Sequence, residues 1–578
     1  MKEILDIRFN GKLNSDISLL FNKISHEKRA DFNEFVTSIS KPNIKNLDWW
    51  VQGPASRNTY SSPLFHYYCV LFLLNHLIQE KRFSFEVIIV NSLSFKVIVE
   101  ELLSNSNIKN CKVCSKYSFK EIIKKIIKKR FLIFYLLFRK CFQLLVVRII
   151  SSNNIPNKPL VLIDTFLMPG YIDNDRWYGS LWDNLSKEQK LETFFVPTVV
   201  LTPLKNIFSL HRKAHLSSRN YIFKENYLTL KDIVFAFGHK KRIRKIKIQK
   251  ISLLGYEFSN LIIEELSNHS DIDTVIDSIL IYRFIGRFRQ AGKKVRLAID
   301  WFEGQGLDKA WNMGFNNYFP DTKTIGYRAS EYFPFYLSTY PIQVEREAHV
   351  IPDIMALHGK GTVFTVKEFL PNLDTIVIPS LKCQYVWEFS ENKLSQSKYV
   401  VLITLPNKSI GYTIFVINRL LNVCNAIPIK SDTTKFLIKP HPAQSLNKIN
   451  KIKSNLPELP NYISLTEEKS FAKLLYLTNI LITEASSTCL EAMACGIPVI
   501  MMENEEGLTY DPIPSRVSEH LFRKVRSQDD LMQALKYFIN STPENLKQQQ
   551  LDSAMVREDY FEPYSQDGVD RFLDIVNK

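Results

Sequence analysis

The chain has 578 residues, too many for one ordinary hydrophobic core, so two or three domains are expected. Hydrophobic residues make up 45% and charged residues 23%, which is typical of globular proteins and excludes a low-complexity or fibrous chain. Lys and Arg number 75 and Asp and Glu 59, and the net charge of 75 − 59 = +16 predicts an anionic partner. Nucleic acid, an anionic membrane surface and a phosphorylated substrate are the candidates.

The N-terminal residues Met1 to Asp6 have no apolar segment behind a basic one, so no secretory signal is expected. Eight scattered cysteines do not fit a disulfide framework. Cys111 and Cys114 form a CxxC pair without the second pair that a zinc ribbon needs. We therefore expect no bound metal and no cofactor.

Apolar runs alternate with helical patterns along the first two thirds of the chain, which predicts an α/β protein with parallel sheets. The expected strands are Phe85–Val90, Leu160–Asp164, Thr193–Val199, Val295–Ile299 and Thr375–Pro379. Asp164, Arg176 and Trp177 follow one of these strands and are candidates for the wall of an acceptor cleft. Glu303-Gly304 follows the strand Val295–Ile299, where an active-site loop is expected.

Two segments concentrate the positive charge. In the first, Lys116–Ile150, lysines recur every four residues and share one face of a helix, while Ile and Phe line another. Those lysines are Lys116, Lys120, Lys124 and Lys128. The apolar run Phe131–Phe138 is shorter than the roughly 20 residues that span a bilayer, so the pattern indicates a helix lying on a membrane surface. The alternative is a core helix with a solvated lysine face.

The second basic segment, Lys240–Lys250, has seven basic residues and no acidic one, which also favours an anionic surface. We expect no nucleic-acid partner, since the chain has no RNP, helix-turn-helix or zinc-finger pattern.

The polar stretch Ser390–Lys398 is predicted to be a linker. Behind it, strands and helices alternate, which predicts a doubly wound domain whose ligands bind beyond the carboxyl ends of the strands. The expected strands are Val400–Leu405, Phe436–Lys439, Tyr462–Leu465, Ile480–Thr483 and Pro498–Met502, and the expected helices are Tyr412–Asn425, Phe471–Leu477 and Ser487–Cys495.

Two motifs stand at strand ends in this part of the chain. In Lys439-Pro440-His441-Pro442 the two prolines fix the backbone around an imidazole that can donate to a phosphate oxygen. In Glu484-Ala485-Ser486-Ser487-Thr488 three hydroxyl residues begin a helix, whose free N–H groups also attract anions. An ordinary helix cap needs only one hydroxyl, so the pair of motifs favours a phosphate site.

The two motifs, with Glu491-Ala492-Met493-Ala494-Cys495-Gly496-Ile497-Pro498-Val499 behind them, resemble GT-B glycosyltransferases of bacterial surface-carbohydrate biosynthesis. They are similar to the His-Pro and Ser-Ser/Thr motifs of bacterial sialyltransferases and capsule Kdo transferases, which bind the phosphate of a CMP-sugar. The resemblance implies that Lys439, His441, Ser486, Ser487, Thr488 and Glu491 bind the nucleotide sugar. It also implies that Glu303, which lies in a partial match to an acidic-acidic-Gly motif of these enzymes, is the catalytic base. His441 is expected to be the second catalytic residue. Asp300 is the next candidate base, and a loop carboxylate paired with Arg or Lys is the alternative for Glu303.

The predicted fold is therefore α/β of the GT-B type, two Rossmann-like domains facing across a cleft. We expect residues 1–389 to form the acceptor-side domain, 390–398 the linker, 399–544 the nucleotide-sugar domain, and 545–578 helices that pack back on the N-terminal domain.

The predicted function is metal-independent transfer of a sugar, with a CMP-activated acidic sugar favoured, to a glycan or lipid-linked glycan acceptor. The expected location is the inner face of the cell membrane. The alternatives are an NDP-hexose or polyol-phosphate transferase, a GT-B-like UDP-sugar 2-epimerase, and a non-catalytic scaffold of polysaccharide assembly.

Overall fold

The computed structural model describes residues 3–9, 11–115, 119–151, 155–173, 175–268, 271–329, 333–389, 399–406, 410–426, 434–441, 444, 446–456 and 458–574. The predicted linker Ser390–Lys398, Lys116 and Pro442 lie outside these residues, as do the side chains of Lys120 and Lys124.

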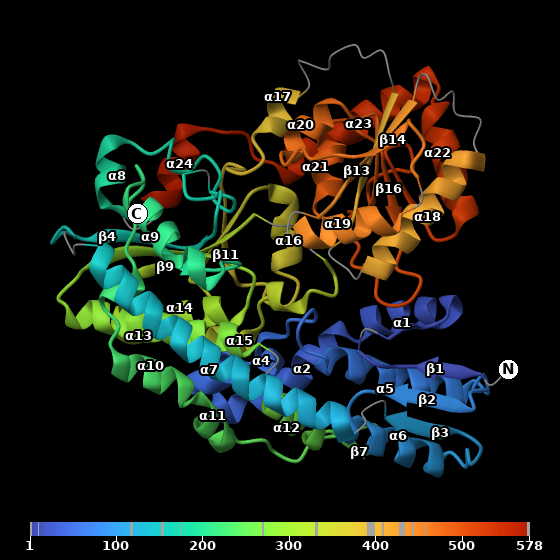
Figure 1. The fold of residues 1–578 in the computed structure, drawn as a ribbon, viewed down its shortest axis with the longest axis horizontal. Coiled ribbons are helices and arrows are strands. Elements are labelled where there is room, and N and C mark those ends of the chain that lie inside the picture. The colour runs from blue at the N-terminus through green and yellow to red at the C-terminus, as the bar shows by residue number, and fades with distance from the viewer. Residues whose placement is uncertain are drawn as a thin grey trace.

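A three-stranded parallel sheet, in the order β1-β2-β3, begins the chain (Figure 1). Its strands are β1 (Ile4–Asp6), β2 (Val87–Val90) and β3 (Lys112–Ser115). The helices of this part are α1 (Ser15–Glu27), α2 (Arg29–Ser40), α3 (Leu47–Trp50), α4 (Gly53–Ser56), α5 (Leu64–Gln79) and α6 (Leu93–Asn105). Trp49 and Trp50 are fully buried, and their indole N–H groups donate to Ser40 Oγ and to the carbonyl of Ile44, so both rings belong to the core.

A six-stranded parallel sheet in the order β11-β10-β9-β8-β4-β5 forms the rest of the N-terminal part. Its strands are β4 (Leu160–Leu167), β5 (Thr193–Val199), β8 (Val295–Trp301), β9 (Lys323–Arg328), β10 (Ile354–Leu357) and β11 (Asp374–Val377). The chain order reverses between β4 and β8, the place where open α/β sheets bind ligands.

Further helices and one hairpin complete the N-terminal part, some beside the second sheet and some beside the first. They are α7 (Phe119–Ile150), α8 (Lys187–Glu192), α9 (Ile207–His215), α10 (Leu230–Phe237), α11 (His239–Arg242), the antiparallel pair β6 (Ser252–Leu253) and β7 (Tyr256–Glu257), α12 (Ser259–Asn268), α13 (Ile272–Gln290), α14 (Gly306–Tyr318), α15 (Gln343–Glu347), α16 (Val363–Val366) and α17 (Tyr385–Glu388). No described helix is both long enough and apolar enough to cross a membrane.

The C-terminal sheet has six parallel strands in the order β14-β13-β12-β15-β16-β17. They are β12 (Tyr399–Thr404), β13 (Thr434–Lys439), β14 (Ile463–Leu465), β15 (Ile480–Glu484), β16 (Val499–Met502) and β17 (Phe522–Val525). Its helices are α18 (Ile410–Ala426), α19 (Leu446–Asn455), α20 (Phe471–Tyr476), α21 (Thr488–Ala494), α22 (Gln528–Ile539) and α23 (Pro543–Tyr560). This is the Rossmann strand order, with its switch point between β12 and β15.

The last helix, α24 (Gln566–Leu573), leaves the C-terminal sheet and returns to the N-terminal one. Its side chains Val569, Phe572 and Leu573 are fully buried in the core beside Leu297 and Tyr327 of the second sheet. This helix therefore completes a core whose strands lie much earlier in the sequence.

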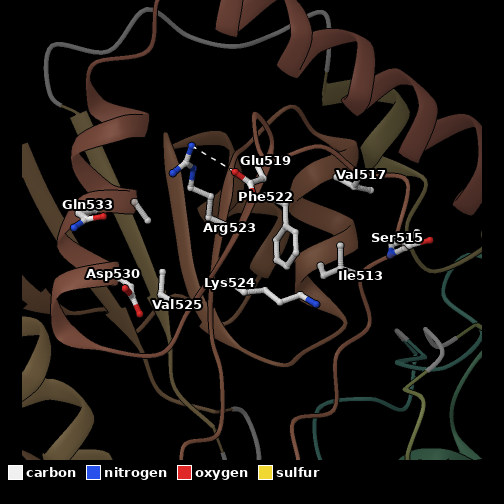
Figure 2. A pocket seen from close by; sticks show the side chains of 12 residues that line it. Ile513, Ser515, Val517, Glu519, Phe522, Arg523, Lys524, Val525, Asp530 and Gln533 are labelled. Carbon is white, nitrogen blue, oxygen red and sulfur yellow. Dashed lines mark ion pairs between the residues drawn. The ribbon is translucent and has the colours of Figure 1, made fainter. Parts of the chain in front are cut away.

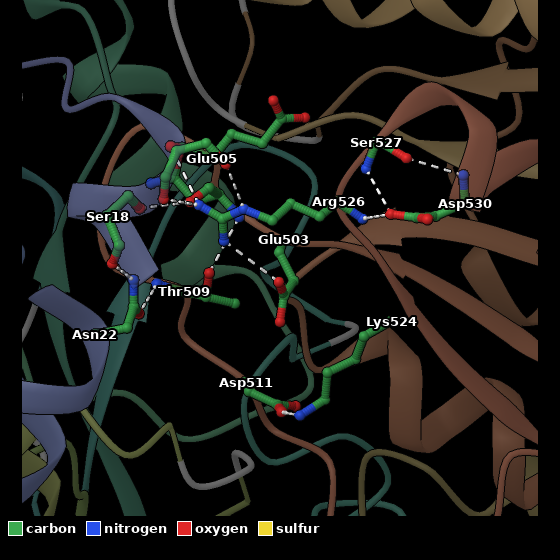
Figure 3. A network of polar contacts seen from close by, with 12 residues as sticks. Ser18, Asn22, Glu503, Glu505, Thr509, Asp511, Lys524, Arg526, Ser527 and Asp530 are labelled. Carbon is green, nitrogen blue, oxygen red and sulfur yellow. Dashed lines mark hydrogen bonds and ion pairs between the residues drawn. The ribbon is translucent and has the colours of Figure 1, made fainter. Parts of the chain in front are cut away.

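One loop of the C-terminal domain is fastened to α1 of the N-terminal part (Figure 3). Asn22 donates to the carbonyl of Gly507 at 2.8 Å and accepts from the N–H of Thr509 at 2.8 Å. Arg526 donates to the carbonyl of Ser15 at 2.8 Å. The bonds of Asn22 hold the loop after β16 against α1, and the bond of Arg526 fastens the segment after β17 to the same helix.

The fold prediction is confirmed, because two Rossmann-like sheets face each other across a cleft in the GT-B layout. The ten strands named from the sequence are all present, with ends shifted by up to three residues. The proposed domain boundaries stay a prediction.

Candidate active site

A cavity of about 1270 Å³ lies where the three sheets come together. The carboxyl ends of β12, β13 and β15 form one wall, and Arg8, Phe9 and Gly11 to Leu13, after β1, form another. Tyr60, Arg176 and Lys382 reach it from the N-terminal part, and Asn504 and Glu506 to Tyr510 close it from the loop on α1. The cavity thus lies at the switch point of the C-terminal sheet, where a nucleotide is expected.

The two motifs found in the sequence meet in this cavity. β12 pairs with β13 on one side and with β15 on the other, so Thr404 lies opposite both Lys439 and Thr483. The segments that follow, with His441 after one strand and Ser486 after the other, therefore project from the same edge of the sheet. Residues about 45 positions apart in sequence become neighbours because a single strand separates them.

His441 lies among positive charges at this edge. Its imidazole is half-buried, and burial lowers its pKa, followed by the nearby charges of Arg176, Lys448 and Lys439. Arg176 comes from the loop after β4 in the opposite domain, and it also lines the cavity. Cations from both domains thus surround one corner, which favours an anionic ligand such as a phosphate.

The hydroxyl turn forms the facing side of the same corner. Thr488 Oγ1 donates to Ser486 Oγ at 3.1 Å, and Ser487, the N-cap of α21, makes no side-chain capping bond. The hydroxyl of Ser487 is therefore not used as a helix cap, and all three hydroxyl residues line the cavity. This arrangement leaves hydroxyl groups that can donate to a ligand.

The two charged residues beside these motifs have protein partners. The ammonium of Lys439 donates to the carbonyls of Glu468 at 2.8 Å and Lys469 at 3.2 Å, and burial lowers its pKa. The carboxylate of Glu491 accepts a short hydrogen bond from the hydroxyl of Tyr385. Both line the cavity, but in this structure Lys439 fixes the loop that carries Lys469.

Glu303 lies in the loop after β8, at the switch point of the second sheet. Its Oε1 accepts from the indole N–H of Trp301 at 2.9 Å, and its Oε2 accepts from Gln305 Nε2 at 2.6 Å. The hydroxyl of Tyr336 donates to the same Oε2 at 3.3 Å. The partners are thus an indole, an amide and a phenol, and no described arginine or lysine is paired with this carboxylate.

Tyr336, a partner of Glu303, packs against Tyr60 at the wall of the cavity. The Tyr60 ring packs edge-on against Tyr336 at 4.9 Å and is stacked on Tyr510, from the C-terminal loop, at 4.6 Å. Tyr60 and Tyr510 line the cavity, whereas Glu303 does not. The structure therefore brings His441 and the hydroxyl turn together in the cavity, and Glu303 lies outside its lining.

Asp308 holds the backbone of the Glu303 loop. Its Oδ2 accepts from the N–H groups of Glu303 and Gln305, both at 2.9 Å, and burial raises its pKa to about 7. Asp300, the second candidate base, is fully buried, and burial raises its pKa as well. Asp300 is therefore not placed to reach a substrate.

Gly304 gives this loop its shape, which leads to a first prediction. Its φ is +69°, and an added Cβ would lie 1.7 Å from the carbonyl oxygen of Ser338. We expect Gly304→Ala to lower the free energy of unfolding, measured in urea, by more than about 1 kcal/mol. The reason is that the backbone at residue 304 or at Ser338 must move to make room for the Cβ. Gly292, with a φ of +71° and open space around it, is the matched control. Equal losses for the two alanine variants would contradict the importance of the contact with Ser338.

A second cavity of about 410 Å³ lies elsewhere on the C-terminal domain, along β17 at the edge of its sheet (Figure 2). The guanidinium of Arg523 lies 3.7 Å from the centroid of the Tyr537 ring and 4.0 Å from the carboxylate of Glu519. None of the candidate site residues lines this cavity, so it is separate from the cleft.

Several residues that line the cleft could not be identified from the sequence. Tyr60 and Tyr510 stand in segments without a motif, and their stacking joins two domains. Lys382 and Lys469 are single lysines in loops. Only their positions in the folded chain show that they face the same cavity.

No protein-family model matches the sequence, and no curated protein matches it. Among solved structures, the chain is similar to MnaA of S. aureus in a co-structure with UDP, at 11% identity and a TM-score of 0.45, over 73% of this chain and 98% of that one. It is similar to UDP-GlcNAc 2-epimerase from Neisseria meningitidis bound to UDP-GlcNAc, at 11% identity and a TM-score of 0.42, over 72% and 99%. It is also similar to MurG of Acinetobacter baumannii, at 9% identity and a TM-score of 0.38, over 72% and 99%.

Likeness at this level carries no argument about substrates. The GT-B layout of this chain is shown by its own two sheets and by the cleft between them.

Proposed function

We propose that the protein is a glycosyltransferase that binds a nucleotide sugar in the cleft and transfers the sugar to a glycan. The observation that carries the proposal is the corner where His441 and the turn Ser486–Thr488 meet, with Arg176 close by. Hydroxyl, imidazole and guanidinium groups there can bind the phosphate of a donor, at the switch point where such sheets bind nucleotides.

In the proposed reaction an acceptor hydroxyl attacks the anomeric carbon of the donor. Its proton passes to Glu303, the bond from the anomeric carbon to the phosphate oxygen breaks, and the nucleotide leaves with the added negative charge. His441 and the hydroxyl turn stabilise that charge by hydrogen bonds that strengthen as it develops. Because Glu303 does not line the cavity, the acceptor has to reach beyond the lining residues to meet this carboxylate.

A CMP-activated acidic sugar is the favoured donor, because the two motifs are similar to those of CMP-sugar enzymes. The acceptor proposed is a glycan on a lipid carrier, and such a substrate would confine the reaction to the inner face of the cell membrane. An NDP-hexose or a polyol-phosphate donor is the alternative within the transferases.

The test is a thermal-shift panel with CMP, CDP, UDP, GDP and ADP. A nucleotide at about 100 times its Kd should stabilise the protein by about 2.7 kcal/mol. Stabilisation by CMP alone supports the favoured donor, and stabilisation by UDP with conversion of a UDP-sugar in the absence of acceptor indicates a 2-epimerase. A protein that no nucleotide stabilises would be a scaffold, and the proposal would fail.

A further inference from the structure

Helix α7 carries a stripe of exposed apolar side chains along its outer face. The inner face packs into the core through Leu136 and Leu144, and buried Lys140 pairs with Asp277 at 2.6 Å. The exposed residues recur at spacings of three, four or seven and so share one side of the helix. They are Ile127, Phe131, Phe134, Phe138, Leu145 and Ile149, while the exposed Leu132 lies on another side of the helix.

Two helices packed against α7 also carry exposed apolar side chains. α9 and α10 both contact α7, and Figure 1 shows them on either side of it. α9 and its end expose Phe208 and Leu216, and α10 exposes Leu230 and Val234. Three helices that come from different parts of the sequence and pack together thus each expose apolar side chains to solvent.

The same surface is positively charged. Its exposed cations are Lys128, Arg130, Lys205, Arg212, Lys213, Lys231, Lys240 and Lys241. Across residues 127–150, 201–219 and 230–242 the only acidic residue is Asp232, which is fully buried and paired with Arg283 and Arg287. No exposed carboxylate therefore offsets the positive charge of this surface in these three segments.

We propose that this surface, formed by α7, α9 and α10, docks on an anionic lipid bilayer. Phe and Leu side chains would enter the boundary between headgroups and acyl chains, and the surrounding Lys and Arg would bind the headgroups. A second copy of the chain fits less well, because a two-fold contact would bring cations against cations. The inference goes beyond the proposed transfer reaction and does not depend on it.

The experiment measures co-sedimentation of the full chain with phosphatidylcholine vesicles, with and without phosphatidylglycerol. Phe131→Ser combined with Phe134→Ser should lower the partition coefficient on anionic vesicles by roughly tenfold or more, because inserted apolar area is lost. The matched control is Phe364→Ser with Leu551→Ser, which removes two other exposed apolar side chains, from α16 and α23. The control should bind like the wild type.

A charge variant tests the second half of the proposal. A variant with Glu in place of Lys231, Lys240 and Lys241 should bind anionic vesicles more weakly, by roughly fivefold or more per residue. Added salt should weaken the binding of the wild type to the same vesicles. The matched control changes Lys435, Lys536 and Lys547, which are exposed on the C-terminal domain, to Glu.

Three outcomes would overturn the proposal. They are unchanged partitioning of the serine pair, equal binding to vesicles without phosphatidylglycerol, and a wild-type dimer that the serine pair converts to a monomer in light scattering. The last outcome would assign the surface to a second copy. Nucleotide binding, measured in the same preparations, should be normal in every variant, which separates this test from that of the cleft.

Discussion

Replacing Glu303 by Gln is expected to lower the rate of sugar transfer by roughly 10²–10⁴-fold, the size of a general-base contribution. The variant keeps the shape of the side chain but cannot take the proton of the acceptor hydroxyl. Nucleotide binding should be retained, because His441 and the turn Ser486–Thr488 lie in the other domain. Transfer assays with saturating donor, beside a titration of nucleotide binding, measure both quantities.

The hydrogen bonds of Glu303 show which control the Glu303→Gln variant needs. Each carboxylate oxygen accepts from a different donor, Trp301 and Gln305, so the amide of a glutamine leaves one donor without an acceptor. Some loss of stability is therefore expected, about 1–3 kcal/mol, and a melting curve shows it. Tyr336→Phe removes the weakest partner while the base remains, so it should reduce transfer far less. Near-normal transfer by a folded Glu303→Gln protein would place the base elsewhere.

Replacing the proposed phosphate-binding residues is expected to have the second large effect on nucleotide binding and turnover. His441→Ala should weaken nucleotide binding and lower turnover by roughly 10²–10³-fold, as loss of one donor to a developing oxyanion does. Alanine at Ser486, Ser487 and Thr488 together should do the same. Unfolding is not expected, because Ser487 makes no side-chain capping bond to α21.

His520 provides the matched control for the histidine variant. It lies before β17, at the amino end of a strand of the same sheet, and its Nδ1 is 2.7 Å from the hydroxyl of Tyr537. His520→Ala should leave nucleotide affinity and turnover close to normal. If His441→Ala and the triple variant behaved like this control in calorimetric titration, the phosphate site would have to lie in another part of the cleft.

The C-terminal sheet could be predicted well because its central strands are continuous apolar runs, as parallel strands buried on both faces must be. Strands that carry polar residues were missed. β9 begins with Lys323 and ends with Arg328, and β1 has only three residues. Pairing with neighbours makes these segments strands, and the pattern of their own residues does not show it.

Some residues of the candidate site could be predicted from the sequence, and others could not. His441 and Ser486 could be named from motifs, and both lie where strand ends were predicted. Their closeness depends on β12 lying between their strands, which sequence order alone does not give. Arg176 was expected on the acceptor side, and the fold brings its charge near His441. The aromatic pair Tyr60 and Tyr510 depends entirely on the packing of two domains.

The basic helix was predicted in the right place. The Ile and Phe side chains before Ile127 lie outside what the structure describes, so that part of the predicted apolar face stays a prediction, and the described exposed stripe runs from Ile127 to Ile149. Periodicity alone could not show which face is buried, because both faces of this helix are apolar. The packing of Leu136 and Leu144 against the core decides it.

The return of α24 to the second sheet has a consequence for synthesis of the protein on the ribosome. Strands β4, β5 and β8–β11 are complete once residue 377 has been made, but Val569, Phe572 and Leu573 cover their core only after the whole C-terminal sheet has followed. Until then the apolar surface around Leu297 and Tyr327 is open to solvent, and such surfaces aggregate or recruit chaperones during translation. A fragment that ends before residue 566 would therefore keep this surface of the second sheet uncovered.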